Sequence, residues 1–394
     1  MIKYLCLLCL ATLVGCTSNP SSNSSLGVID LSGDYPTRKV DLKEIADVEY
    51  VPLETTDNSL LTNMCSTNNI SDNYIITYDT SSGDIFLFTR SGKFLRKINK
   101  KGDGPEEYVR LSNLAVDFEA EELFIRDFPN KKCHIFSFEG VYKRSFPWMT
   151  KGLSSWSNLN KDYLIGYDDG YSYKTQYFAD THPFYLMDKK DGKLTPLNLT
   201  VPNGISSTFK SVIVKLGPGE SYMSSPSLPI YSLLKNGDEA LIADFSLDTL
   251  YSFKEGILTP IAVKTPSARS TTPPTVIAPE LYTDSFLFFR VISMYYDESD
   301  HFKPYDEAPK LFWNRKTNQV ENWEIYNSDI DAPTARLPLA RRDNFSNRNM
   351  GVMIYSAENL INLYKEGKLK GKLKEVASKL DGEDNHVLVI AKYK

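Results

Sequence analysis

The sequence predicts an all-β chain folded as a six-bladed β-propeller, and three observations lead to this prediction. Most of the 394 residues show two-residue apolar alternation, and the composition of 21 Gly, 21 Pro, 24 Tyr and 20 Phe is typical of strands and turns. One apolar phrase occurs six times along the chain. The shorter intervals between its copies match the ~40–50 residues of a four-stranded propeller blade.

The six copies of this phrase mark the repeating unit. They read "YIITYD", "LFIRD", "YLIGYD", "ALIAD", "FLFFR" and "GVMIYS", and they end at Asp79, Asp127, Asp168, Asp244, Arg290 and Ser356. Successive ends are 48, 41, 76, 46 and 66 residues apart, so two units carry insertions. Radial stacking of small twisted sheets buries both faces of each sheet. A β-sandwich would explain the alternation but not the sixfold phrase.

The N-terminal residues 1–15 are predicted to be a signal peptide, because Lys3 precedes an apolar run too short to span a bilayer. The sequence Leu13-Val14-Gly15-Cys16 resembles the lipobox of bacterial lipoproteins, which implies acylation of Cys16; the alternative is an ordinary signal with a chance cysteine. Residues 16–28 are polar and predicted to be a flexible tether, and residues 29–394 form the propeller. We expect an envelope protein on the periplasmic side of the outer membrane, touching the membrane through this lipid only.

In the last fifty residues, the strand-like alternation gives way to helical spacing before a final strand-like segment. Leucines at helical spacing, among them Leu360, Leu363 and Leu373, alternate with lysines and predict two short helices. Residues 387–393 are again strand-like, as are residues 48–53. Since a propeller ring closes best when both termini share a blade, we expect these two segments to pair.

The stretch "INKKGDGPEEYVRL", residues 98–111, contains a glycine-rich turn. It does not fit a phosphate-binding loop, because two glutamates follow the glycines and strand-like residues follow those. The stretch from this turn to residue 146 resembles one NHL-type propeller unit. The residues that fill the places of that pattern are Gly102, Gly104, Tyr108, Asp127, Asn130 and Gly140.

From about residue 28 to its end, the chain resembles the six-bladed propeller lipoproteins of Gram-negative bacteria. The resemblance rests on "IADVEYVPLETTDNSLL", "GDGPEEY" and "LDGEDNHVLVIAKYK". It implies the fold and leaves the activity open. It also implies that the GDGPEEY turn connects the outer strand of one blade to the inner strand of the next, on the face where many propellers bind ligands. Tyr108 and Arg110 are therefore candidate rim residues.

The aspartates that end four of the phrases, Asp79, Asp127, Asp168 and Asp244, form a candidate ring for a ligand or for a hard cation such as calcium. The alternative is that each carboxylate accepts backbone N–H groups of its own turn. Arg290 takes the corresponding place in the fifth phrase and would pair with a carboxylate on a ligand. No cofactor follows with certainty from these residues.

Two insertions supply further candidate rim residues. "YDDGYSYKTQYF" contains Tyr171 and Tyr173, which could stack on sugars or peptides, and "ARLPLARRDNF" contains Arg341 and Arg342, which suit an anionic ligand. Covering a neighbouring blade and forming ordinary salt bridges are the alternatives for these residues.

Several chemistries find little support in the sequence. The four histidines occur singly, which disfavours a zinc site, and no Gly-x-Ser-x-Gly elbow is present. The net charge of −5 disfavours nucleic acid as a partner. Outside the signal and Cys16, only Cys65 and Cys133 remain, and they form either one bridge or two buried thiols.

The function predicted from the sequence is that of a lipid-anchored envelope propeller. It would bind a glycan, a peptide or a partner protein through its channel face and loops. One alternative is a cation-dependent hydrolase or lyase, for which no catalytic residue can be assigned, and another is a purely structural scaffold. We favour a binding protein over an enzyme.

Overall fold

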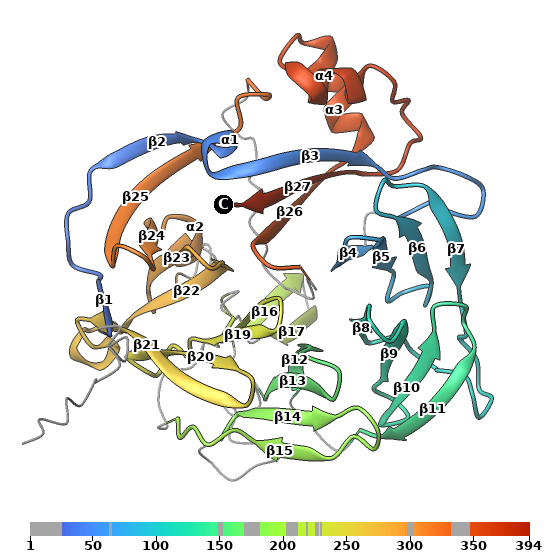
Figure 1. Ribbon diagram of the computed structural model, residues 1–394, viewed down its shortest axis with the longest axis horizontal. Coiled ribbons are helices and arrows are strands. Elements are labelled where there is room, and N and C mark those ends of the chain that lie inside the picture. The colour runs from blue at the N-terminus through green and yellow to red at the C-terminus, as the bar shows by residue number, and fades with distance from the viewer. Residues whose placement is uncertain are drawn as a thin grey trace, which may run out of the picture.

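Six β-sheets surround a central axis in the computed structural model of the chain (Figure 1). The structure describes residues 26–62, 65–148, 153–168, 182–201, 212–217, 220–224, 228, 231–295, 297, 303–331 and 347–394. Each sheet is one blade, so the predicted six-bladed β-propeller is confirmed. The six apolar phrases of the sequence fall on strands β5, β9, β13, β19, β23 and β26, one in each blade.

The first three blades are four-stranded antiparallel sheets in which consecutive strands are neighbours. Blade 1 contains β4 (Ser66–Ile70), β5 (Tyr74–Tyr78), β6 (Ile85–Thr89) and β7 (Phe94–Ile98). Blade 2 contains β8 (Asn113–Asp117), β9 (Glu122–Asp127), β10 (Lys132–Ser137) and β11 (Tyr142–Pro147). Blade 3 contains β12 (Leu153–Asn158), β13 (Tyr163–Asp168), β14 (Phe184–Asp188) and β15 (Leu194–Pro196). Strand β9 is buried along its whole length, because neighbouring blades cover both of its faces.

Blades 4 and 5 each gain a fifth strand from the N-terminal segment. Blade 4 contains β18 (Leu233–Asn236), β19 (Glu239–Ile242), β20 (Thr249–Lys254) and β21 (Ile257–Thr265), and blade 5 contains β22 (Thr275–Tyr282), β23 (Phe286–Ser293), β24 (Lys310–Asn314) and β25 (Gln319–Tyr326). Strands β1 (Gly27–Asp30) and β2 (Thr37–Asp41) pair in parallel with β21 and β25. The N-terminal segment thus wraps around the outside of two blades (Figure 1). Strand β1 begins two residues before the predicted propeller boundary at residue 29.

Blade 6 closes the ring with strands from both ends of the chain. Its described strands are β26 (Met350–Tyr355), β27 (Val387–Tyr393) and β3 (Ala46–Pro52), in that order. Strand β27 pairs antiparallel with β3, and Val389 lies opposite Tyr50. The predicted pairing of the two termini is therefore confirmed. The short helix α1 (Leu42–Ile45), with Asp41 and Glu44 in a capping box, precedes β3.

The two predicted C-terminal helices are also confirmed. Helices α3 (Ala357–Lys365) and α4 (Gly371–Ala377) lie between β26 and β27, and Leu360 and Leu373 are fully buried against this blade. The Ser356 hydroxyl caps α3 by accepting the N–H of Asn359. The remaining described elements are the single turns η2 (Ala268–Ser270) and α2 (Lys303–Asp306), and the hairpin of β16 (Val212–Gly217) and β17 (Glu220–Ser224). None of the described helices is long and apolar enough to cross a membrane.

The hydrophobic core consists of layers between adjacent blades rather than one central cluster. Cys65 packs in the layer between blades 6 and 1, and Cys133 packs in the layer between blades 2 and 3. Both thiols are buried and free, so the buried-thiol alternative holds. Where the tight turn between the outer strands of blade 1, 2 or 3 packs against the neighbouring blade, the turn contains a glycine. Gly192 has a φ of 75°, and a Cβ there would lie 2.3 Å from the Phe146 ring of the preceding blade.

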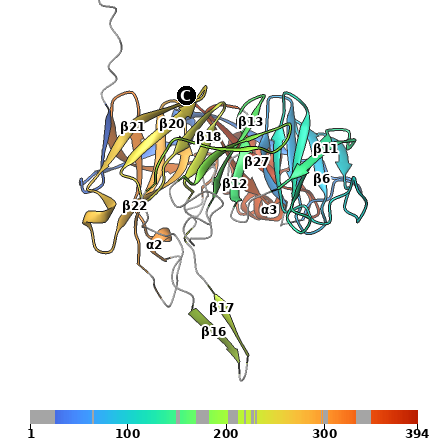
Figure 2. The same ribbon diagram turned by 90° about the horizontal axis from the view of Figure 1, so that it is seen from below.

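The up-and-down order of the strands gives the ring two different faces. We use the name loop face for the end formed by the second-to-third-strand turns, such as 79–84 and 128–131, and by the connections between blades, such as 99–112. The opposite face consists of short turns such as 71–73 and 118–121. The β16–β17 hairpin and α2 extend from the loop face (Figure 2). Chain length beyond what the blades need is therefore concentrated on the loop face.

Candidate functional site

The blade 1 to blade 2 connection, residues 99–112, shapes one part of the loop face. Tyr108 is fully buried beneath it. Its hydroxyl donates to the Gly83 carbonyl at 2.7 Å and accepts the Lys100 N–H at 3.0 Å. Burial raises the pKa of Tyr108 to about 12. The connection does join an outer strand to the next inner strand as expected. However, the predicted rim role of Tyr108 is wrong, because this side chain is buried under the turn and its hydroxyl is hydrogen-bonded to the backbone there.

Asp127 fixes the same connection from the blade 2 side. Its carboxylate accepts the backbone N–H groups of Val109 at 3.1 Å and Arg110 at 3.2 Å. It also accepts the Asn130 side-chain amide at 2.9 Å. Because the carboxylate is fully buried, these bonds satisfy it within the protein and hold the backbone at Arg110 in place.

Asp79 plays a similar part in blade 1. It accepts the Ser81 N–H and the Thr62 hydroxyl, both at 2.7 Å. Burial raises the pKa of this carboxyl, but the hydrogen bonds from Thr62 and Ser81 outweigh it, so the net pKa is below the usual range. The bond to Thr62 ties the second-to-third-strand turn to the connection that enters the blade.

Asp244 accepts the Ser246 N–H at 2.8 Å and the Tyr167 hydroxyl at 3.3 Å, and burial raises its pKa. Asp168 is also buried, at the last position of β13. Asp79 and Asp244 thus each accept the backbone N–H two residues further along the chain, as in the Asx-turn alternative, whereas Asp127 accepts those of Val109 and Arg110 in the preceding connection. Across the described residues, no three His, Cys, Asp or Glu side chains gather as metal ligands. A ring of these aspartates around a ligand stays a prediction.

Arg290 does not present its charge to the channel. Its Nε donates to Glu280 Oε1 at 2.6 Å, and its Nη1 donates to the Tyr305 carbonyl at 3.1 Å. The guanidinium also lies 4.5 Å from the centre of the Tyr305 ring. With 6% of the residue exposed, Arg290 is committed to Glu280 inside blade 5. The predicted pairing of Arg290 with a ligand carboxylate is therefore corrected.

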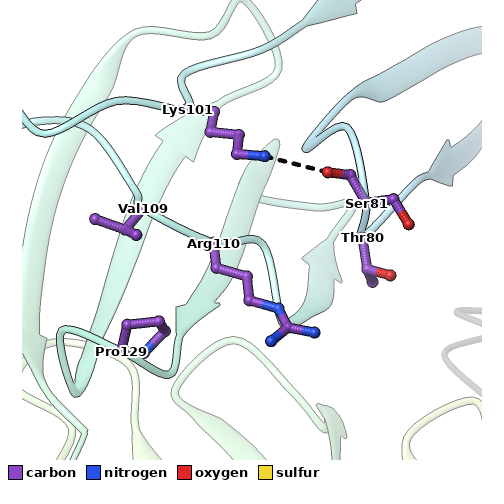
Figure 3. A pocket seen from close by; sticks show the side chains of 6 residues that line it. All are labelled: Thr80, Ser81, Lys101, Val109, Arg110 and Pro129. Atoms are coloured by element: carbon purple, nitrogen blue, oxygen red, sulfur yellow. Dashed lines mark hydrogen bonds between the residues drawn. The ribbon is translucent and has the colours of Figure 1, made fainter.

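A cavity of about 320 Å³ opens on the loop face between blades 1 and 2 (Figure 3). We call it the Arg110 pocket, and its lining residues are Thr80, Ser81, Lys101, Val109, Arg110 and Pro129. Lys101 Nζ donates to the Ser81 carbonyl at 3.2 Å. Within the described part of the chain, the Arg110 side chain has no hydrogen bond or ion pair. Of the predicted rim residues, Arg110 therefore does lie at a cavity. Sequence reasoning missed Lys101, although it precedes the glycine-rich turn.

A second cavity of about 610 Å³ lies at the outer rim between α4 and the end of β3. Its lining mixes charges of both signs: Lys93, Lys372 and Lys379 with Glu54, Glu375 and Asp384. This groove could not be predicted from the sequence, because its walls come from segments far apart in the chain.

Buried lysines on the opposite face were also missed. Lys189 donates to Asp117 at 2.5 Å across blades 2 and 3. Lys235, on the first strand of blade 4, donates to the Asn158 carbonyl. Burial, reinforced by the nearby Lys189 charge, lowers the pKa of Lys235 to about 7. Lysine side chains usually extend to solvent, so nothing in the sequence marked these two as buried.

The remaining predicted site residues lie outside the described part of the chain. They are Cys16, Tyr171, Tyr173, Arg341 and Arg342.

The fold and the asymmetry of its two faces define a six-bladed propeller with elaborated loops on one face. The chain belongs to the family described as "Domain of unknown function (DUF4934)", whose model matches residues 26–392. No curated protein matches the chain.

Two solved structures from Bacteroides are similar to it. A protein from Bacteroides fragilis NCTC 9343, described as a "Putative exported protein", is 16% identical, with a TM-score of 0.62, over 93% of this chain and 99% of that one. A member of the DUF4221 family from Bacteroides vulgatus ATCC 8482 is 11% identical, with a TM-score of 0.48, over 89% of this chain and 97% of that one. The first of these similarities supports the propeller fold.

Proposed function

We propose that this protein is an envelope-anchored binding protein that holds a ligand or partner on its loop face. The observation that carries this proposal is the concentration of long connections, the β16–β17 hairpin and the Arg110 pocket on that face. Binding sites occur preferentially on loops that a rigid scaffold positions. A propeller supplies such a scaffold, because each blade is packed on both sides.

The anchor in this proposal is an acyl chain on Cys16. The motif that ends in Cys16 and the polar residues 17–25 precede a folded region that begins at β1. The similarity to an exported protein agrees with an envelope location, and we place the protein on the periplasmic side of the outer membrane. Labelling of cells with a clickable palmitate should mark the wild-type protein and leave the Cys16→Ser variant unmarked and released from membranes. Equal labelling of both would contradict the anchor.

The ligand class in this proposal is a glycan, a peptide or a protein. We expect at least one member of a panel of envelope glycans and peptides to raise the melting temperature of residues 26–394. The increase should be smaller in a variant that replaces residues 202–230 by a short Gly-Ser linker. If no panel member raised the melting temperature, the binding proposal would fail, and a purely structural role would be supported.

The cation-dependent hydrolase or lyase is tested separately by metal analysis of the purified protein. A stoichiometric cation that disappears on Asp127→Asn and Asp244→Asn would favour that alternative. A metal-free protein would contradict the cation-dependent alternative.

A further inference from the structure

We propose that the Arg110 pocket recognises the carboxylate of a sugar acid, with Arg110 as the primary contact and Lys101 as a second cation. This inference deepens the proposed function and rests on it, since it names the ligand class for one site on the loop face. Of the residues that the structure describes, two cations and no acidic side chain line the pocket. At about 320 Å³, it is at the lower end of ligand-pocket sizes and suits a group as large as one sugar ring.

The position of Arg110 is fixed although its side chain is free. Asp127 accepts the backbone N–H groups of Val109 and Arg110, and Tyr108 fills the space beneath the turn. The guanidinium itself is exposed and has no protein partner among the described residues. A guanidinium without a protein partner can bind a carboxylate through two hydrogen bonds. Because the backbone at Arg110 is already fixed, binding costs little backbone entropy.

Lys101 approaches the same cavity from the other side of the turn. Its ammonium donates one hydrogen bond to the Ser81 carbonyl at 3.2 Å, as Figure 3 shows. An ammonium has three donors, so two remain for a ligand. The carbonyl bond holds the lysine at the pocket wall without neutralising its charge, because a carbonyl carries no net charge.

The two walls of the pocket differ in polarity, and this difference favours a sugar over other anions. Val109 and Pro129 give an aliphatic wall, whereas Thr80 and Ser81 bring hydroxyl groups on the other side (Figure 3). A pyranose ring has an apolar C–H face and a hydroxyl rim, and both walls would find a matching surface. Inorganic phosphate would use the cations alone, and an extended peptide would need a free strand edge or a groove longer than this cavity.

The test is calorimetric titration of a glucuronate-containing disaccharide into residues 26–394. We expect binding by the wild type, and a loss of about ten- to a hundredfold in affinity for Arg110→Ala, as for removal of hydrogen bonds to a charged group. Arg110→Lys should recover part of the affinity, and Lys101→Met should lose less than Arg110→Ala. Arg96→Ala is the matched control, because Arg96 is an exposed arginine on the outer strand β7, where it pairs with Glu139. It should bind like the wild type.

The competing outcomes are distinct. Absence of binding by the wild type, or equal affinity in Arg110→Ala, would overturn the inference. Equal or tighter binding of the neutral disaccharide, inorganic phosphate or a glutamate-rich peptide would overturn the choice of a sugar acid. If the glycan and peptide panel still raised the melting temperature in any of these cases, the proposed function would survive. If it did not, both would fail. Melting temperatures of all variants verify folding, and Arg110→Ala should match the wild type because its side chain makes no contact that the fold requires.

Discussion

Two arginines lie near the loop face, Arg110 at the entrance to blade 2 and Arg290 on the second strand of blade 5. They differ in burial and in the partners of their side chains. Arg290 is buried and bonded to Glu280 and to the Tyr305 carbonyl. Arg110 is exposed, and among the described residues only its backbone is bonded, to Asp127. The same residue type therefore supports folding at one site and remains available for a ligand at the other. Burial and the presence of a matched carboxylate decide between the two roles.

The largest effect is expected from breaking the blade 5 pair. Arg290→Ala leaves the Glu280 carboxylate buried without its cation, which should lower the free energy of unfolding by about 3–5 kcal/mol. Urea denaturation measures this. The double variant Arg290→Met with Glu280→Leu should recover most of the loss, because it removes both charges. A single variant as stable as the wild type would contradict the structural role of Arg290.

The next effect concerns the residue that holds Arg110 in place. Asp127→Ala leaves the N–H groups of Val109 and Arg110 without their acceptor and should cost about 1–3 kcal/mol of unfolding free energy. It should also weaken binding at the Arg110 pocket. Asp103→Ala, an exposed aspartate in the same connection, is the control and should change neither quantity. Equal effects of the two substitutions would mean that Asp127 does not position the turn.

Lys235 extends the comparison to a buried cation that is bonded to a carbonyl. Burial lowers its pKa to about 7 in the folded protein, from the ordinary lysine value of 10.5. Between pH 7 and pH 10.5 this lysine binds more protons in the unfolded chain than in the folded protein. It therefore makes the free energy of unfolding rise with pH, by at most about 1.4 kcal/mol per pH unit. Lys235→Met should remove this contribution from urea denaturation series at pH 7.5, 8.5 and 9.5. The exposed Lys93→Met control should keep it, and an unchanged slope in Lys235→Met would refute the lowered pKa.

A smaller effect is expected from the tyrosine beneath the connection. Tyr108→Phe removes the hydroxyl that donates to the Gly83 carbonyl, at a cost of about 1 kcal/mol of unfolding free energy. Thermal denaturation should show a lower melting temperature. Tyr364→Phe, at a tyrosine that is 38% exposed, should leave the melting temperature unchanged. A Tyr108→Phe variant that melts with the wild type would show that water replaces this bond.

The smallest effect on stability is expected at Arg110 itself. Arg110→Ala should change the free energy of unfolding by less than about 0.5 kcal/mol, as for surface substitutions that touch no structural feature. Chemical denaturation of this variant beside Arg290→Ala makes the comparison direct. A loss comparable to that of Arg290→Ala would mean that Arg110 has a structural partner, and the contrast between the two arginines would disappear.

The sequence predicted one strand in each blade, the one that carries the recurring apolar phrase, because most residues of these strands are covered by neighbouring blades. It could not predict β2, since this added edge strand buries only Val40 and shows no alternation. The partners of the site residues were also hidden. Glu280 lies ten residues from Arg290, and Asp127 lies 17 residues from Arg110, so each contact depends on how turns fold back. Position in the repeat predicted a ligand role for both Arg290 and Arg110, and only burial in the structure separated them.

We have proposed that Arg110, at the entrance to blade 2, is a ligand contact. Isothermal titration of the glucuronate disaccharide into the wild type and Arg110→Ala, at equal protein concentration and low salt, tests it most directly. We predict a saturable isotherm for the wild type and at least about tenfold weaker binding for the variant, with both proteins equally folded. Superimposable isotherms for the two proteins would contradict the claim.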